Sequence, residues 1–465
     1  MKTDIQGFSQ NLEHFHEVGF IYIYEILSGF HDACREKKDF DWRKTFNFIY
    51  TYINRESFWN DEFIVEKGEW LGGANHLWII GIIAELIEEG TRDNSHVYGR
   101  QRTKKAKEIL FLILNKLSPD NDDISEYVSH ALNSAAGKAI TALIYLVLKI
   151  IRIDSKTDMN NSARWGNEYR IKYDELLKAP FIEAYTLLGR YLPNFFYLDK
   201  EWVSGKISDF EILQNTPQWE AFMDGYFSIG QLYDDVYDMM NKHYSYAILH
   251  QFKDQHNREY LVQHISLAYL RKKEAIDNTD GNLCKLLNKW DTDDIKIMVD
   301  FFWGQRKIVL KNEEMRNNVL SFWQWLFDTR YGNNEHFDNK ENAVLARLAK
   351  FGVFLRTIDD QAFEWLLISV PHVEGFESSY IIRYLAKFDE KQSIKYAGQL
   401  LLKMVESRRI DHENDRVLSI VKKLYKNAEK EVANGICNAF GMRGDDFLRE
   451  IYDEFNPIEY PRHYG

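Results

Sequence analysis

Apolar side chains recur along most of the chain with a period near 3.6 residues, and polar side chains occupy the opposite face. The segment 391–404 is an example. Its apolar positions are Ile394, Ala397, Leu401 and Met404, and its polar positions are Lys391, Lys395, Gln399 and Lys403. This pattern predicts an amphipathic helix. Comparable patterns before and after it predict helices throughout.

The composition favours the same fold class. Only 7 prolines and 25 glycines interrupt 465 residues, which indicates long helices joined by short connections. A hydrophobic content of 45% is enough for a large core. We therefore expect an all-α protein.

Regular spacing of helix starts in the last third predicts a repeat architecture. Starts are expected near Asp359, Glu377, Glu390, Glu413 and Glu429. A helix pair then occupies about 35–40 residues, the length of HEAT or TPR repeats, although no repeat consensus is present. We expect stacked helix pairs, arranged as a HEAT-like or TPR-like α-solenoid or as a layered helical array.

Four polar stretches predict loops between helical layers, at residues 54–67, 118–125, 154–165 and 331–342. They suggest three regions. Residues 1–125 form an N-terminal helical region, 126–330 a central helical region, and 331–465 a C-terminal helical-repeat region.

A net charge of −12 argues against the phosphate attraction on which nucleic-acid binders rely. One basic cluster exists, and we interpret it as a solvated helix start rather than a nucleic-acid patch. It comprises Arg100, Arg102, Lys104, Lys105 and Lys107.

The cysteine pattern and the hydropathy predict a cytoplasmic protein without a membrane span. Cys34, Cys284 and Cys437 lie far apart and form no CxxC pair, as is typical of a reducing compartment. The N-terminus carries no signal-peptide core. The longest apolar stretch, residues 140–151, is too short to cross a bilayer.

Asp234, Asp235 and Asp238 form the most enzyme-like string, because on a helix they share one face. Carboxylate oxygens suit Mg²⁺. The string resembles the DDxxD motif of class I terpenoid synthases, which are also all-α, and that resemblance implies a Mg²⁺-dependent enzyme. The second metal motif of that family is missing after Asp293-Asp294 and after Asp359-Asp360. A solvated acidic face is the simpler interpretation.

Other catalytic and metal-binding motifs are absent from the sequence, including the zinc-protease, nucleotide-loop and nucleophile-elbow patterns. We expect no catalytic, cofactor-binding or metal-binding residues. Aromatic content is high, however, with 12 Trp, 27 Tyr and 30 Phe. Four aromatic residues stand in polar, loop-like settings typical of interface anchors, with local packing as the alternative. They are Phe58, Trp59, Tyr331 and Phe337.

Residues 130–240 carry three ordered motifs. The first contains Leu132, Asn133, Gly137 and Lys138; the second Arg190, Leu192, Phe196, Tyr197 and Trp202; the third Trp219, Phe222, Gly225 and Tyr226. This trio resembles the C-terminal helical region of bacterial antiphage STAND NTPases of AVAST systems and of related Sir2-linked defence proteins. The resemblance covers about a quarter of the chain.

The resemblance implies a sensor of helical repeats that binds a phage protein, such as a large terminase subunit or a portal. It also implies an upstream ATPase through which the whole protein would associate with itself, and this sequence lacks an ATPase motif. The motif residues are interpreted as fold-defining. Our functional expectation is a non-catalytic recognition scaffold of that sensor type. The alternatives are the terpenoid-synthase-like enzyme and a structural adaptor unrelated to defence.

Overall fold

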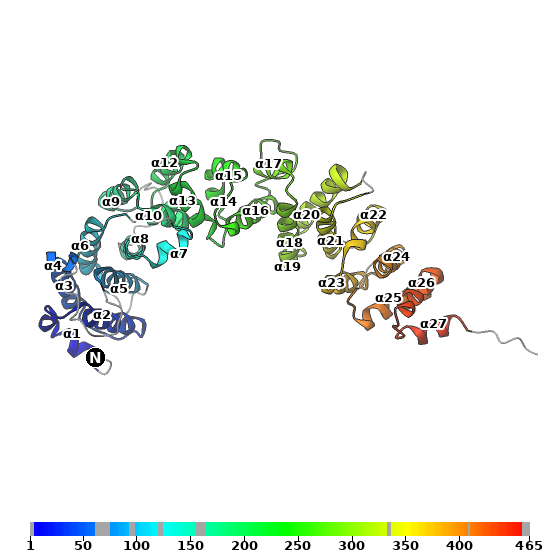
Figure 1. Cartoon of the computed structure of the whole chain (residues 1–465), viewed down its shortest axis with the longest axis horizontal. Helices are drawn as coiled ribbons and strands as arrows, with labels where there is room; N and C mark the ends of the chain where they lie inside the picture. The colour runs from blue at the N-terminus through cyan, green and yellow to red at the C-terminus, as the bar shows by residue number, and fades with distance from the viewer. Residues whose placement is uncertain are drawn as a thin grey trace, which may run out of the picture. The chain divides into compact units, whose positions relative to one another are not determined.

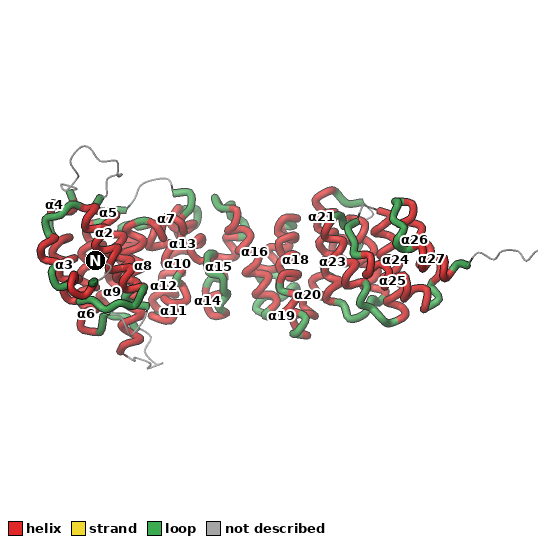
Figure 2. The backbone as a smooth tube through the Cα atoms, turned by 90° about the horizontal axis from the view of Figure 1, so that it is seen from below, coloured by secondary structure: helices red, strands yellow, loops and turns green. Residues whose placement is uncertain are grey.

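The computed structural model describes residues 4–60, 75–92, 98–119, 124–154, 164–332, 336–407 and 410–457. These ranges contain 27 α-helices, five short 3₁₀ or π segments and no β-strand (Figures 1 and 2). The all-α fold expected from the hydrophobic period is confirmed. The chain divides into two compact units, Met1–Tyr260 (unit 1) and Leu261–Gly465 (unit 2).

Unit 1 is built from helices that pack in layers. The row α2, α5, α8, α10, α13 is continuous, since each of these helices packs on the next, while α3 packs on α6 and α6 on α8. The helices of unit 1 are α1 (Ile5–Ser9), α2 (Phe20–Arg35), α3 (Trp42–Ile53), α4 (Glu56–Trp59), α5 (His76–Glu89), α6 (Arg100–Lys116), α7 (Tyr127–Asn133), α8 (Ala135–Asp154), α9 (Asn167–Lys178), α10 (Ile182–Arg190), α11 (Leu192–Leu198), α12 (Lys200–Phe210), α13 (Pro217–Phe227), α14 (Asp234–Met239) and α15 (Asn241–Ala247), with the 3₁₀ segments η1 (Leu12–Phe15) and η2 (Glu211–Leu213).

Helix α16 (Gln255–Leu270) contains the division between the units. Within unit 2, α18 packs on α21, α21 on α22, and α24 on α25 and α26. The remaining elements of unit 2 are α17 (Asn282–Lys289), α18 (Thr292–Gly304), α19 (Arg306–Val309), α20 (Glu313–Leu326), the π segment η3 (Phe327–Tyr331), α21 (Asn339–Leu348), η4 (Ala349–Phe354), α22 (Asp360–Ser369), η5 (Val370–His372), α23 (Phe376–Leu385), α24 (Lys391–Ser407), α25 (Asn414–Lys426), α26 (Lys430–Met442) and α27 (Arg449–Phe455).

The helix starts predicted for the last third of the chain are confirmed to within about one residue. The five helices begin at Asp360, Phe376, Lys391, Asn414 and Lys430. Local capping explains two of these starts, those of α22 and α24, because a cap is formed by residues that are neighbours in sequence. The Asp359 carboxylate, for example, accepts a hydrogen bond from the Ala362 N–H at 2.8 Å and so begins α22.

The divisions expected near residues 125 and 330 fall inside the compact units. Helices α5 and α6 precede residue 125 and pack on α8, which follows it, while α18 and α21 pack together across residue 330. The four expected loops fall partly outside the described residues, at 61–67, 120–123, 155–163 and 333–335. The described part of the first loop contains the short helix α4.

Helix α13 is enclosed by its neighbours in unit 1, and every residue from Trp219 to Phe227 is buried. It contains two acidic side chains that accept hydrogen bonds from distant backbone. The Asp224 carboxylate accepts from the Val128 N–H at 3.0 Å, and the Glu220 carboxylate accepts from the Lys253 N–H at 2.8 Å. Burial raises the pKa of Asp224. These contacts join α13 to the start of α7 and to the segment before α16.

Candidate protein-binding groove

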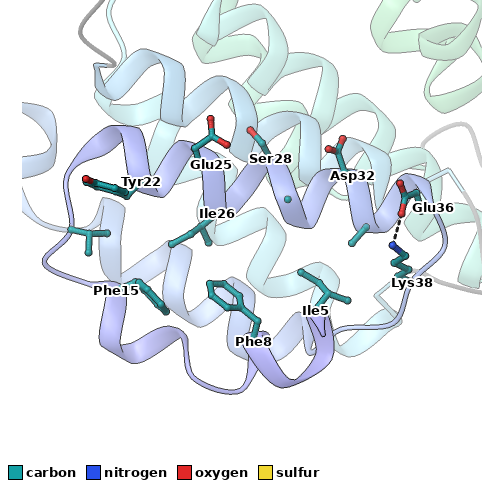
Figure 3. A pocket seen from close by; sticks show the side chains of 13 residues that line it. Ile5, Phe8, Phe15, Tyr22, Glu25, Ile26, Ser28, Asp32, Glu36 and Lys38 are labelled. Atoms are coloured by element: carbon teal, nitrogen blue, oxygen red, sulfur yellow. Dashed lines mark ion pairs between the residues drawn. The ribbon is translucent and has the colours of Figure 1, made fainter. Parts of the chain in front are cut away.

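An open cavity of about 680 Å³ lies in unit 1 between α2 and the preceding segment that contains α1 and η1 (Figure 3). Its apolar lining comes from both sides. It is formed by Ile5, Phe8, Phe15, Val18, Ile26 and Ala33. The volume falls within the range of ligand-binding pockets. We call this cavity the N-terminal groove.

The sequence of α2 explains why the groove is open. Phe30 and Leu27 point into the core and are almost completely buried. Ser28, Gly29 and Ala33 instead line the groove, and no bulky side chain arises from these positions to fill it. On the opposite wall, the rings of Phe8 and Phe15 lie 5.2 Å apart and form a continuous apolar surface.

Acidic side chains border the groove along α2. All three of these side chains are exposed: Glu25 and Asp32 stand two turns apart on α2, and Glu36 follows Asp32 by one turn, at the C-cap of the helix (Figure 3). One cation lines the same border: the Lys38 ammonium lies 2.6 Å from the Glu36 carboxylate. Three carboxylates against one ammonium give the border a negative charge.

Two further features of the groove are an exposed tyrosine and a buried serine hydroxyl. Tyr22 stands at its border with 66% of its surface exposed, the kind of amphipathic aromatic residue that anchors protein interfaces. The Ser28 hydroxyl oxygen is buried in the wall and makes no hydrogen bond within the described part of the chain. A buried hydroxyl without a partner costs free energy in the folded protein.

The structure corrects two of the four aromatic anchors expected from the sequence. Phe58 and Tyr331 are completely buried, so neither can contact a partner at the surface. Trp59 is half-buried, and its indole N–H donates to the Ile53 carbonyl at 2.7 Å. Phe337 is half-buried and packs edge-on against Tyr331, with ring centroids 5.4 Å apart. Local packing, the alternative interpretation, describes these residues better.

The first family-like motif lies at the junction of α7 and α8. A methyl group at Gly137 would lie 1.8 Å from the Ala131 carbonyl oxygen, so only glycine permits this approach. The Asn133 amide donates to the Ser129 carbonyl at 2.8 Å. Lys138 forms a 2.7 Å ion pair with Glu85 of α5. Leu132 is exposed.

The second motif connects α10 to its neighbours. The Arg190 guanidinium donates to the Ser228 hydroxyl at 2.9 Å, just beyond α13. Trp202 of α12 packs against a buried aromatic group, and its indole N–H donates to Asp174 at 3.2 Å. The rings in contact with it are Trp165, Tyr173 and Phe195.

The third motif forms the buried helix α13. Trp219 follows Pro217, which occupies the first turn, and the Thr216 hydroxyl caps the helix by accepting from the Trp219 N–H. The Tyr226 hydroxyl lies 2.9 Å from that of Tyr244. Gly225 faces the Thr186 carbonyl of α10. Several residues of the three motifs therefore join helices, among them Gly137, Arg190 and Gly225, whereas Leu132 and Tyr197 are exposed.

The acidic string Asp234, Asp235 and Asp238 lies on the six-residue helix α14, and all three residues are exposed. None of them lines the N-terminal groove. Among the described residues, no group of three or more His, Cys, Asp or Glu side chains is arranged to hold a metal ion. The three carboxylates therefore lie at the surface of unit 1.

The basic cluster at the start of α6 is partly neutralised. The Lys107 ammonium lies 2.8 Å from the Glu168 carboxylate and that of Lys105 lies 3.1 Å from Glu108. The Lys105 ammonium also lies 3.4 Å from the centre of the Tyr50 ring. These contacts agree with the interpretation as a helix start.

Sequence reasoning missed the N-terminal groove. One signal was available: acidic and small residues share a face of α2 on which a core helix would carry large apolar side chains. The position of α1 and η1 on that face is a tertiary feature, which the sequence pattern does not specify.

Comparisons with protein-family models, with curated proteins and with solved structures find no match to this chain. In the part of the chain that the structure describes, no single helix has the length and apolarity to cross a bilayer. The helices Tyr127–Asn133 and Ala135–Ile153, which are bent by 77° relative to each other, reach that length and apolarity only when they are taken together.

Proposed function

We propose that this chain is a non-catalytic recognition scaffold that binds a protein partner through the N-terminal groove. The observation that carries the proposal is the groove itself, an open apolar cavity with an acidic border, built on a layered helical array. Helical arrays present extended surfaces suited to recognising other proteins. Exposed contiguous apolar surface bordered by polar residues is typical of an interaction site.

We further propose that the scaffold is the sensor part of an antiphage defence protein and that its partner is a phage protein of the terminase or portal type. This part rests on the resemblance of residues 130–240. The motif residues support the scaffold part of this proposal, because they hold α7, α8, α10 and α13 together. A structural adaptor unrelated to defence would use the same kind of scaffold and is the competing proposal.

The test is capture of partners by the purified, tagged full chain from lysates of phage-infected and uninfected bacteria, followed by mass spectrometry. Any phage protein retained is then purified and titrated against the chain by calorimetry. The sensor proposal expects a phage protein in the infected lysate only, and direct binding of the purified pair.

The matched variants are Ser28→Trp, which places a large side chain in the groove, and Asp445→Lys with Asp446→Lys, which changes exposed charges in unit 2. Binding should be lost in the first and kept in the second. If the chain retains no phage protein from several phages, the sensor proposal fails. If it retains the same cellular protein from both lysates, the adaptor is favoured.

A further inference from the structure

We infer that the N-terminal groove accepts the apolar face of a cationic amphipathic helix. This inference rests on the proposed function, because it names the partner chemistry of the same surface. Three observations carry it: the length of the groove, the apolar character of its floor, and the position of its carboxylates.

The length of the groove matches a helix. Its lining residues on α2 extend from Tyr22 to Glu36. At 1.5 Å per residue, this distance is about 21 Å, or four helical turns. A partner helix of similar length would lie along α2 and place apolar side chains at i, i+3, i+4 and i+7 against Phe8, Phe15 and Ile26, which is a common mode of peptide recognition.

The carboxylates at the border favour a partner helix with positive charge. Glu25 and Asp32 are exposed and stand two turns apart, a spacing of about 10 Å. Cationic side chains two turns apart on the flank of the docked helix would pair with them. Glu36 already pairs with Lys38, and the Asp32 carboxylate lies 3.8 Å from Nδ1 of His31, so both contribute less than Glu25. Exposed pairs add little affinity individually, but they set the orientation and raise the association rate.

The same charges disfavour other occupants of the cavity. A fatty acid or phospholipid would fit the apolar floor, but its carboxylate or phosphate would meet a border of three carboxylates and one ammonium. An acidic helix meets the same repulsion. A helix with an apolar face and a basic flank can pack on the apolar floor and pair with the acidic border.

The experiment measures binding of a fluorescent synthetic peptide to the intact chain by anisotropy. The probe is a helix-forming peptide of about 18 residues, with leucines on one face and lysines on its flanks. One control peptide has glutamates in place of the lysines. Another has the same composition in an order that destroys the apolar face. Only the first should bind, and more weakly as the salt concentration rises.

Variants of the chain distinguish the groove from the overall negative charge. Glu25→Lys with Asp32→Lys should weaken binding about tenfold or more. Asp445→Lys with Asp446→Lys, the same change in net charge, should leave it within about twofold. Glu25→Gln with Asp32→Asn should weaken peptide binding by an amount between those two values. Circular dichroism checks that each variant is folded. Since both groove carboxylates are exposed, these variants decide the test even if Ser28→Trp fails to fold.

Two results would overturn the inference: equal weakening by both charge reversals, or equal binding of the lysine and glutamate peptides. These outcomes are separable from failure of the sensor proposal. A chain that binds the basic peptide in the groove and retains no phage protein keeps this inference and loses the sensor. A chain that retains a phage protein and binds none of the peptides keeps the sensor proposal and loses this inference.

Discussion

Gly189 of α10 and Gly225 of α13 each face a backbone carbonyl of the other helix. A methyl group added at Gly225 would lie 1.9 Å from the Thr186 oxygen, and one added at Gly189 would lie 2.1 Å from the Phe222 oxygen. Each carbonyl belongs to the residue three positions before the opposite glycine. The two helices therefore touch backbone to backbone within unit 1, and only glycine permits that distance at both positions.

Gly225→Ala should destabilise the protein by about 1–3 kcal/mol or more, because the added methyl group must separate two packed helices. The control is Gly205→Ala. Gly205 lies within α12, is exposed, and has no atom within 4 Å of an added methyl group. There the replacement should raise stability by about 0.5–1 kcal/mol. Urea unfolding measures both, and an unchanged midpoint for Gly225→Ala would contradict the close packing.

The buried imidazole of His243 should make the unfolding free energy depend on pH. Its Nδ1 accepts from the Trp219 indole N–H at 2.9 Å, and its Nε2 lies 3.0 Å from the Ile207 carbonyl oxygen. The ring is therefore neutral, with the proton on Nε2. Burial lowers the pKa of His243 below its usual value of 6.5.

Above pH 6.5 the imidazole is neutral in both the folded and unfolded states, and its full contribution to stability is present. Below pH 6.5 the His243 imidazole binds a proton in the unfolded chain but stays neutral in the folded chain. The unfolding free energy should therefore fall by up to about 1.4 kcal/mol per pH unit as the pH is lowered. His243→Gln keeps a donor and an acceptor but does not titrate. Its stability should therefore fall less between pH 7 and pH 5 in urea titrations. Burial also lowers the pKa values of His16 and His250, so some pH dependence should remain. Equal slopes in variant and wild type would refute the assignment.

Mg²⁺ should not bind at α14. Asp234, Asp235 and Asp238 are exposed on a short helix, where hydrated carboxylates hold Mg²⁺ weakly. Millimolar Mg²⁺ should therefore leave the melting temperature unchanged in the wild type and in Asp234→Ala, and neither protein should turn over a prenyl diphosphate. A Mg²⁺-dependent rise in Tm that disappears in Asp234→Ala would favour the terpenoid-synthase alternative instead.

The features predicted correctly from the sequence are those that local physics determines. The hydrophobic period identified the helices, and capping located the start of α22 at Asp359. The motif around Gly225 was recognised, but Gly189 was not, because its role depends on which helix lies opposite. The division between the units was missed for a related reason. It falls inside α16, where no loop marks it.

The groove and the aromatic anchors show the same limit. Phe58 stands among polar neighbours in sequence, yet in the structure it packs against Phe20, Tyr52 and Trp59 with no exposed surface. Sequence neighbours report the local environment, whereas burial depends on segments that arrive from elsewhere. The groove likewise requires α1 and η1 to lie against α2, which no pattern within α2 could indicate.

Tyr331 provides a test of that correction. Its ring is fully buried near Trp290, Phe327 and Phe337, and its hydroxyl makes no hydrogen bond within the described part of the chain. Burial raises its pKa well above the usual value. Tyr331→Ala should leave a cavity and cost about 3–5 kcal/mol, the range for removing a large buried aromatic ring.

Tyr331→Phe separates the ring from the hydroxyl. Because the buried hydroxyl has no partner among the described residues, its removal should leave stability unchanged or raise it by about 1 kcal/mol. Urea unfolding of both variants measures the two effects. Partner binding by folded Tyr331→Phe should equal that of the wild type, since the residue has no exposed surface. A loss of binding without a loss of stability would restore Tyr331 as an interface anchor and would require the segment around η3 to open when the partner binds.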